Sequence, residues 1–301
     1  MLDSIRAKLH KRYFDMRVRG IFETPPAPCN PEADFVVLSQ LHAPHLTMYM
    51  VALKSFARFV IPREYVLVDD GLSAADRALI SRNVDRVRFL SVSEVERGSC
   101  PSGGCWERLC AISSLNEYDY VIQLDSDTLT LCRPDEVLDC LATNRSFTLG
   151  TYRGRELVSL ESASEYASSL DSQHVQVLGE AAFARYPDKE AHRYVRGCAG
   201  FAGFAKTAAR LEAVSDFSQT MSGLVGAKKW AEWGSEQLTS NFFIANSEEP
   251  VVLPVESYPF MSDKVEPERC KLIHFYGHAR FEGGLYARLA QKLVADLNFR
   301  L

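Results

Sequence analysis

Short apolar runs alternate with helical stretches along the first part of this sequence. Runs with the length and composition of strands lie at 35–40, 64–71, 87–92 and 120–124, and helical patterns lie between them at 48–60, 73–84 and 105–115. Parallel strands need long crossover connections, which are usually helices. The alternation therefore predicts an α/β fold, in which a largely parallel sheet carries helices on both faces.

Two of these predicted strands end in acidic residues. Asp69 and Asp70 close the strand at 64–71, and Asp125 and Asp127 follow the strand at 120–124. Ligands of such sheets bind beyond the carboxyl ends of the strands. Unpaired carboxylates near a core repel each other and lose hydration, so we expect these acids to meet at one crevice beside a positive group.

The spacing of Asp125 and Asp127 suits a metal ion. In an extended segment, residues two apart point to the same side. The two carboxylates could then bind one hard cation such as Mg²⁺ or Mn²⁺, whose shell is commonly completed by water and substrate phosphates. This indicates a metal-bound diphosphate. A helix cap and a turn residue are the alternative, and the tripeptide alone does not decide between them.

Composition and charge restrict the class of partner. The 301 residues are 47% hydrophobic and 24% charged, which is an ordinary globular balance, and the net charge of -5 argues against nucleic acid. The eight cysteines include no CxxC pair, which favours reduced, structural thiols. The sequence shows neither a signal-peptide pattern nor a membrane-spanning run, so we expect a cytoplasmic protein.

Residues 1–31 are predicted to form an amphipathic arm followed by a proline-rich linker at 24–31. One face of a helix over residues 1–20 would carry Leu2, Ile5, Leu9, Tyr13 and Met16. We expect this face to dock on the body of the protein or on a partner. Because the helix is rich in lysine and arginine, peripheral contact with an anionic membrane is the alternative.

Several separated segments match one known pattern in the same order along the chain. They are MVALKSF (50–56), YVLVDDGLS (65–73), WERL (106–109), LDSDTL (124–129), GCAGFAGF (197–204), EQLTSN (236–241) and HFYGHAR (274–280). Together they resemble glycosyltransferase family eight, the group of glycogenin and the bacterial lipopolysaccharide galactosyltransferases. The resemblance implies a GT-A fold, which is Rossmann-like, over residues 32–301. Its donor-binding half would be 32–150 and its acceptor-facing half 151–301.

The resemblance also implies roles for individual residues. Asp125, Asp127 and His274 would bind Mn²⁺ or Mg²⁺. His45, Asp69 or Asp70, Arg108 and Arg280 would contact the nucleotide, phosphates or sugar of a UDP-sugar, and Ser126 and Gly277 lie within the same donor-binding motifs. Gln237 and Glu236 would lie beside the reacting sugar carbon, with Arg108 stabilising charge in the transition state.

The activity that the resemblance implies is metal-dependent transfer of a hexose from a UDP-sugar, with retention of anomeric configuration, to a glycan, lipid-linked or protein acceptor. Two alternatives stay open. One is a non-catalytic member that binds a nucleotide sugar or glycan. The other is a haloacid-dehalogenase-type phosphatase, against which Leu129 in the fifth position of the motif and the motif's distance from the N-terminus both count.

This sequence departs from the family pattern at three places. Cys198 stands where the family has asparagine, Arg280 replaces a lysine, and Phe281 and Glu282 follow instead of Pro-Trp. Residues 151–195 match no part of the pattern, and their charged and aromatic content suits a segment that faces the acceptor.

Overall fold

The structure is a computed structural model that describes residues 2–117, 119–260 and 265–299. Its strands are β1 (Phe35–His42), β2 (Tyr65–Asp70), β3 (Val87–Ser91), β4 (Tyr120–Leu124), β5 (Thr128–Thr130), β6 (Phe147–Leu149), β7 (Val158–Ser159), β8 (Arg193–Tyr194), β9 (Cys198–Phe204), β10 (Val251–Leu253) and β11 (Leu272–His274). Its α-helices are α1 (Leu2–Val18), α2 (Leu46–Ala57), α3 (Ala74–Asn83), α4 (Trp106–Leu115), α5 (Asp135–Ala142), α6 (Leu160–Ser168), α7 (Val175–Ala182), α8 (Leu211–Val225), α9 (Ala227–Trp230), α10 (Ser235–Ala245) and α11 (Leu285–Asn298).

The sheet confirms the α/β class that the sequence predicts. Seven strands follow the order β10-β6-β9-β4-β1-β2-β3. β1 pairs with β2 in parallel, and β10 pairs with β6 in parallel, whereas β6 and β9 are antiparallel. Each strand and helix expected between residues 35 and 124 is present. Ser73 caps α3 as expected, through a capping box with Asp76.

The chain divides into two compact units. The first consists of Met1–Phe89, Leu124–Pro134 and Glu256–Leu301. The second consists of Leu90–Gln123 and Asp135–Val255. The residues that the resemblance assigns to the site are distributed between the two units.

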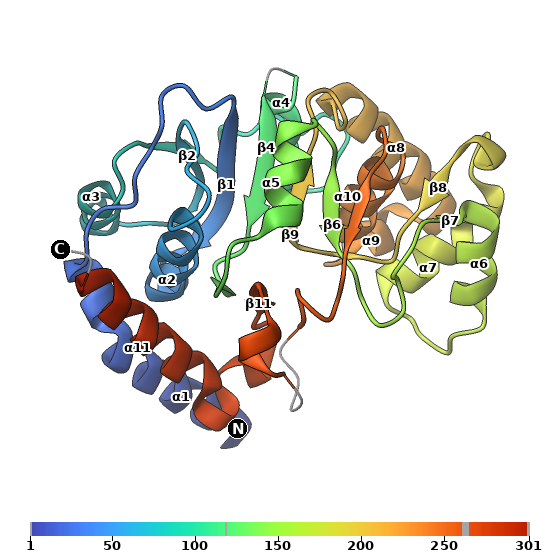
Figure 1. Ribbon diagram of the computed structural model, residues 1–301. Helices are drawn as coiled ribbons and strands as arrows, with labels where there is room; N and C mark the ends of the chain where they lie inside the picture. Colours follow the sequence, from blue (N-terminus) through green and yellow to red (C-terminus); the bar gives the residue numbers. More distant parts are fainter. Residues whose placement is uncertain (1, 118, 261–264, 300–301) are drawn as a thin grey trace. The chain divides into compact units, whose positions relative to one another are not determined.

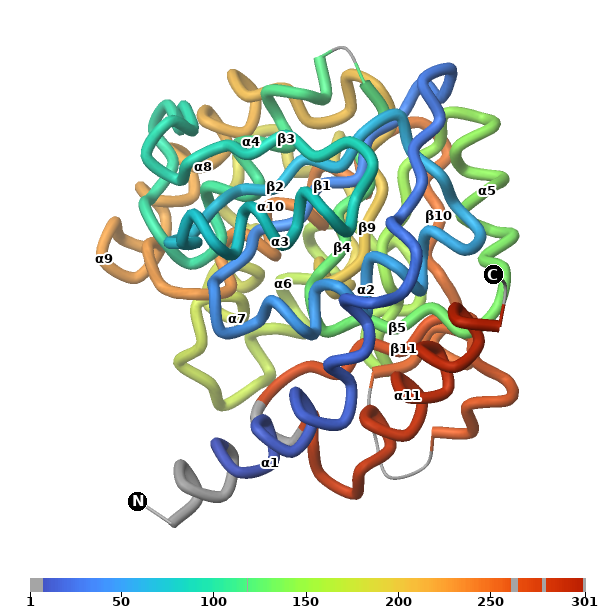
Figure 2. Tube along the Cα trace, turned by 90° about the vertical axis from the view of Figure 1, so that its left-hand side faces the viewer, coloured from blue at the N-terminus to red at the C-terminus, as the bar shows by residue number. Residues whose placement is uncertain are grey.

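In the first unit, α1 packs against α11 (Figures 1 and 2). The buried face of α1 is not the predicted one. Phe14 and Val18 are buried, whereas Leu9, Tyr13 and Met16 are 58%, 48% and 60% exposed. Phe14 contacts Tyr286 of α11 at 4.4 Å between ring centroids, and this aromatic contact sets the face of α1 that turns inward. The side chains of Leu2 and Ile5 lie outside the described residues.

The proline-rich segment at 24–31 is attached to the body of the first unit. The Ala27 N–H donates to the carbonyl of Asn83, at 2.9 Å. The ammonium group of Lys54 on α2 donates to the carbonyls of Ile21 and Thr24, at 3.0 and 3.1 Å, and to the side chains of Thr24 and Asn83, at 2.9 and 2.7 Å. This buried lysine therefore connects the arm to α2 and α3.

In the second unit, α10 packs on β9 and β6, and α7 and α8 pack on α10. Trp106 and Trp230 are buried, with their ring centroids 6.0 Å apart, and their indole nitrogens donate to Ser235 and Ser218. Trp230 is thus a core residue, while Trp233 is 65% exposed. The segment 151–195 contains α6 and α7 between two short strands, β7 and β8, which pair antiparallel (Figure 1).

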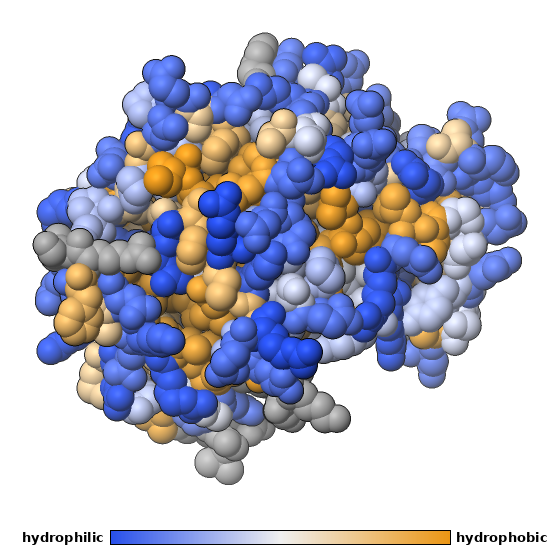
Figure 3. Space-filling model, in the orientation of Figure 1, coloured by the Kyte–Doolittle hydropathy of each residue, from blue (hydrophilic) through white to orange (hydrophobic). Residues whose placement is uncertain are grey.

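Figure 3 shows one face of the molecule, coloured by hydropathy. Polar side chains dominate this face, and apolar groups are visible in patches among them (Figure 3). Among the described residues, no helix combines the length and apolar character that crossing a bilayer requires. All eight cysteines are free thiols, as the sequence predicts.

Candidate functional site

A two-stranded sheet in the first unit brings the DSD segment to the HFYGHAR segment. β4 ends at Leu124, the two aspartates follow, and β5 pairs with β11 in antiparallel register, with Thr128 opposite His274. The Phe275 N–H donates to the carbonyl of Asp127, at 2.8 Å. Residues far apart in the sequence are therefore fixed side by side by backbone hydrogen bonds (Figure 2).

This pairing brings together three side chains that could hold a metal ion. One ligand atom each from Asp125, Asp127 and His274 lies within 4.8 Å of the others. Nε2 of His274 is 3.2 Å from Oδ1 of Asp127, and both side chains are buried. Two carboxylates and an imidazole form a donor set that suits Mn²⁺ well and Mg²⁺ less well. The residues present therefore fit the divalent ion that the sequence implies.

Arg280 supplies the positive charge at this cluster. Its guanidinium Nη1 is 2.9 Å from Oδ2 of Asp127, and its Nε donates to the carbonyl of Gly277, at 2.6 Å. Gly277 has a φ of +80°, which favours glycine. Burial by itself raises the pKa of Asp127, but His274 and Arg280 outweigh it, so that the pKa is lowered and the carboxylate stays ionised.

The two acids at the end of β2 have different surroundings. Asp69 is buried, accepts from the Leu72 N–H at 2.7 Å and pairs with Arg77 at 2.6 Å. Asp70 is only half-buried, so its carboxylate is the more accessible of the two. His45 is half-buried at the start of α2, and burial together with the charge of Arg280 lowers its pKa. At neutral pH its ring is therefore uncharged.

In the second unit, Arg108 and Glu236 form a buried ion pair. Arg108 lies on α4 and Glu236 in the first turn of α10, and one guanidinium nitrogen donates to both carboxylate oxygens, at 3.1 Å each. The Ser240 hydroxyl also donates to Glu236, at 3.3 Å. A buried charge needs such pairing, so the contact holds α4 against α10 whatever else these residues do.

The amide of Gln237 is held at both ends. Its Oε1 accepts from the Ala199 N–H on β9, at 3.2 Å, and its Nε2 donates to Oε1 of Gln176, at 3.1 Å. Gln176 in turn donates to Glu180, at 3.1 Å. Sequence reasoning did not find Gln176 or Glu180, because they lie in the segment 151–195, which matches no known pattern.

The predicted site residues thus fall into two groups. Asp125, Asp127, His274 and Arg280 cluster within the first unit, with Ser126 half-buried between the two aspartates. Arg108, Glu236 and Gln237 are positioned within the second unit, where Gln237 accepts from Ala199, the residue after the half-buried Cys198. Asp125 and Asp127 follow the end of β4, His274 ends β11, and Arg108, Glu236 and Gln237 lie in the first turns of α4 and α10.

No protein family model matches the sequence, and a search of curated proteins finds no similar chain. Solved structures are similar in fold. The galactosyltransferase LgtC, solved in complex with donor and acceptor sugar analogs, superposes with a TM-score of 0.55 over 87% of this chain and 96% of its own, at 13% identity. The chain has a GT-A fold.

Two further structures share this GT-A fold. An active-site mutant of LgtC gives a TM-score of 0.52 at 12% identity, over 87% of this chain and 96% of its own. The bifunctional glycosyltransferase WbbM gives 0.50 at 16% identity, over 88% of this chain. The chain spans about half the length of WbbM, at 53%.

Proposed function

We propose that this chain is a metal-dependent glycosyltransferase that uses a UDP-sugar. The observation that carries the proposal is the cluster of Asp125, Asp127 and His274 with Arg280, located after β4 on a GT-A fold. Asp127 is buried and keeps its charge beside Arg280, and Arg280 offers a second contact for an anionic substrate.

The residues of the first unit would hold the donor. Asp125, Asp127 and His274 would bind Mn²⁺ or Mg²⁺, and the bound ion would act as a Lewis acid toward the departing diphosphate. Arg280 carries a planar fork of donors, which suits phosphate oxygens. Asp70 and His45 are the proposed contacts to the nucleoside, and Asp70 is preferred to Asp69 because the turn after β2 already uses the Asp69 carboxylate.

The residues of the second unit would act on the sugar. Gln237 is the proposed residue beside the reacting carbon, in a reaction that retains anomeric configuration. Its amide is oriented by Ala199 and Gln176, so its position is set before any substrate binds. Arg108 and Glu236 would support this end of α10, and Arg108 would add positive charge that stabilises the transition state. A glycan, a lipid-linked sugar or a protein is the proposed acceptor.

Calorimetric titration of UDP tests the donor half of this proposal. We expect UDP to bind the wild-type chain with Mn²⁺ and to bind weakly or undetectably after chelation. Mutating a residue that only orients a metal ligand typically lowers metal affinity by roughly 10–100-fold. Asp127→Asn removes a proposed ligand itself and should weaken Mn²⁺-dependent UDP binding by more than this. Asp85→Asn, at an exposed position of the same unit, is the matched control and should bind as the wild type does. Equal UDP affinity with and without the metal would contradict the proposal.

A further inference from the structure

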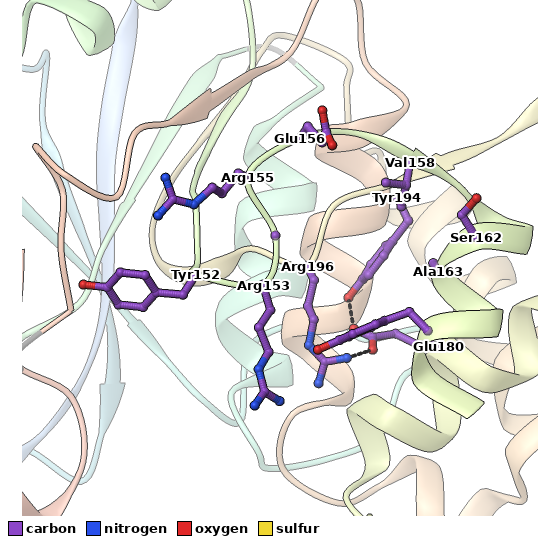
Figure 4. Close-up of a pocket in the computed structure, with 12 residues that line it drawn as sticks. Tyr152, Arg153, Arg155, Glu156, Val158, Ser162, Ala163, Glu180, Tyr194 and Arg196 are labelled. Atoms are coloured by element: carbon purple, nitrogen blue, oxygen red, sulfur yellow. Dashed lines mark hydrogen bonds and ion pairs between the residues drawn. The ribbon is translucent and has the colours of Figure 1, made fainter. Parts of the chain in front are cut away.

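A cavity of about 390 Å³ lies within the second unit (Figure 4). Its volume falls within the roughly 300–1,000 Å³ of ordinary small-molecule sites. One side is the turn around Arg153 and Arg155, another is α6, and Glu180, Tyr194 and Arg196 line the rest. None of the residues that the sequence assigns to the donor lines it.

The arginine-bearing turn is held firmly against the rest of the cavity. The Thr151 hydroxyl donates to the carbonyl of Arg196, at 2.7 Å, and Thr151 and Gly154 form a backbone bridge. A Cβ on Gly154 would come within 2.2 Å of the Arg196 carbonyl oxygen, so only glycine allows this approach. The backbone that carries Arg153 and Arg155 is therefore fixed before a ligand arrives.

A buried network forms the floor of the cavity. Glu180 is 1% exposed, accepts from the Tyr194 hydroxyl at 2.8 Å and from Gln176 at 3.1 Å, and forms an ion pair with Arg196. The guanidinium of Arg196 also lies over the ring of Tyr166, at 5.6 Å from its centroid. The side chain of Arg196 is thus oriented by two neighbours, Glu180 and Tyr166.

The charge of the cavity favours an anion. Arg153, Arg155 and Arg196 outnumber Glu156 and Glu180, and the carboxylate of Glu180 is already paired with Arg196. In Figure 4 the side chains of Arg153 and Arg196 extend in the same direction from their backbones. Arginine forks bind carboxylate and phosphate oxygens in pairs of hydrogen bonds, and tyrosine rings such as that of Tyr166 offer apolar faces to a sugar ring.

The same network reaches the residue proposed to act on the sugar. Gln176 donates to Glu180 and accepts from Gln237, so two side-chain hydrogen bonds connect the floor of the cavity to Gln237. We propose that this cavity binds the acceptor through an acidic group, either the carboxylate or the phosphate of an anionic saccharide. The inference rests on the proposed transferase function, because it assigns the second substrate of that reaction.

Direct binding to the full chain, without donor or metal, tests the inference. The probes are the methyl glycoside of glucuronic acid, glucose 6-phosphate and methyl glucoside, titrated by ligand-observed NMR. We expect the charged probes to bind, and the uncharged glycoside to bind at least about tenfold more weakly, since charge-assisted hydrogen bonds contribute that much or more. The tighter of the two charged probes identifies carboxylate or phosphate as the group recognised.

Variants locate the binding. The double variant Arg153→Ala/Arg155→Ala changes only exposed side chains. It should lower the affinity for the charged probes by about tenfold or more. Arg210→Ala removes an exposed arginine of the same unit that lies outside the cavity, and it should leave binding unchanged. Three outcomes would overturn the inference. Methyl glucoside could bind as tightly as the charged probes, the double variant could keep its affinity for them, or neither charged probe could bind. Failure of Mn²⁺-dependent UDP binding would instead contradict the proposed donor site.

Discussion

At the scale of single residues, Asp127 is where the contacts of the proposed donor site meet. Its two carboxylate oxygens contact His274 and Arg280, and its backbone carbonyl accepts from Phe275. Sequence pattern could predict Asp125 and Asp127 from their place after a strand. The position of His274 beside them followed only from the resemblance, because no local pattern predicts which strand pairs with β5.

Arg280 and Gln237 should affect catalysis in different ways. Arg280 contacts the Asp127 carboxylate and is proposed to bind diphosphate in the ground state and the transition state alike, so Arg280→Ala should raise the apparent donor KM by roughly tenfold or more. Gln237→Ala should lower kcat with little change in KM, because its contact matters when charge builds on the sugar carbon. Steady-state kinetics on both variants measure KM and kcat. NMR of the product should show the same anomeric configuration as the donor. A pure KM effect in Gln237→Ala, or an inverted product, would refute the role given to Gln237.

At the scale of elements, α1 shows where sequence pattern is ambiguous. Two different faces of this helix carry apolar residues at helical spacing, one with Leu9, Tyr13 and Met16 and one with Phe14 and Val18. The second is buried because Phe14 packs on Tyr286 of α11, which lies at the other end of the sequence. Periodicity within one helix carries no information about that partner, so it does not show which face docks on the body of the protein.

Lys54 allows the attachment of this arm to be tested by pH. Burial lowers the pKa of Lys54 to about 8, while its four oxygen acceptors keep the ammonium form at neutral pH. Between pH 8 and the unfolded value near 10.5 the unfolded chain binds more protons, so Lys54 makes folding more favourable as pH rises through this range.

The free energy of unfolding of wild type minus that of Lys54→Met should therefore increase from pH 8 to pH 10. Chemical denaturation at each pH measures it. Lys228→Met, which removes an exposed lysine, is the matched control for the loss of one ammonium group. A flat difference for Lys54→Met would show that this lysine is not desolvated in the folded chain.

At the scale of the whole molecule, the sequence predicted the class of the fold but not all of its parts. The strands and helices between residues 35 and 124 follow from periodicity, because each has its own apolar pattern and boundary residues. The network of Gln176, Glu180 and Arg196 could not be predicted from periodicity. It depends on contacts among α7, the segment after β8 and α10, which only the folded chain creates. The anion-binding cavity was therefore accessible only from the structure.

The central claim is that this GT-A chain transfers sugar with the help of a divalent ion, and release of UDP from a panel of UDP-sugars tests it most directly. With Mn²⁺ and a mixture of saccharide acceptors, at least one UDP-sugar should yield UDP. Chelation should abolish the release, and Asp127→Asn should slow it by roughly 100-fold or more. Full activity after chelation would contradict the metal site. UDP-sugar binding without any release of UDP, across the whole panel, would contradict the transferase itself.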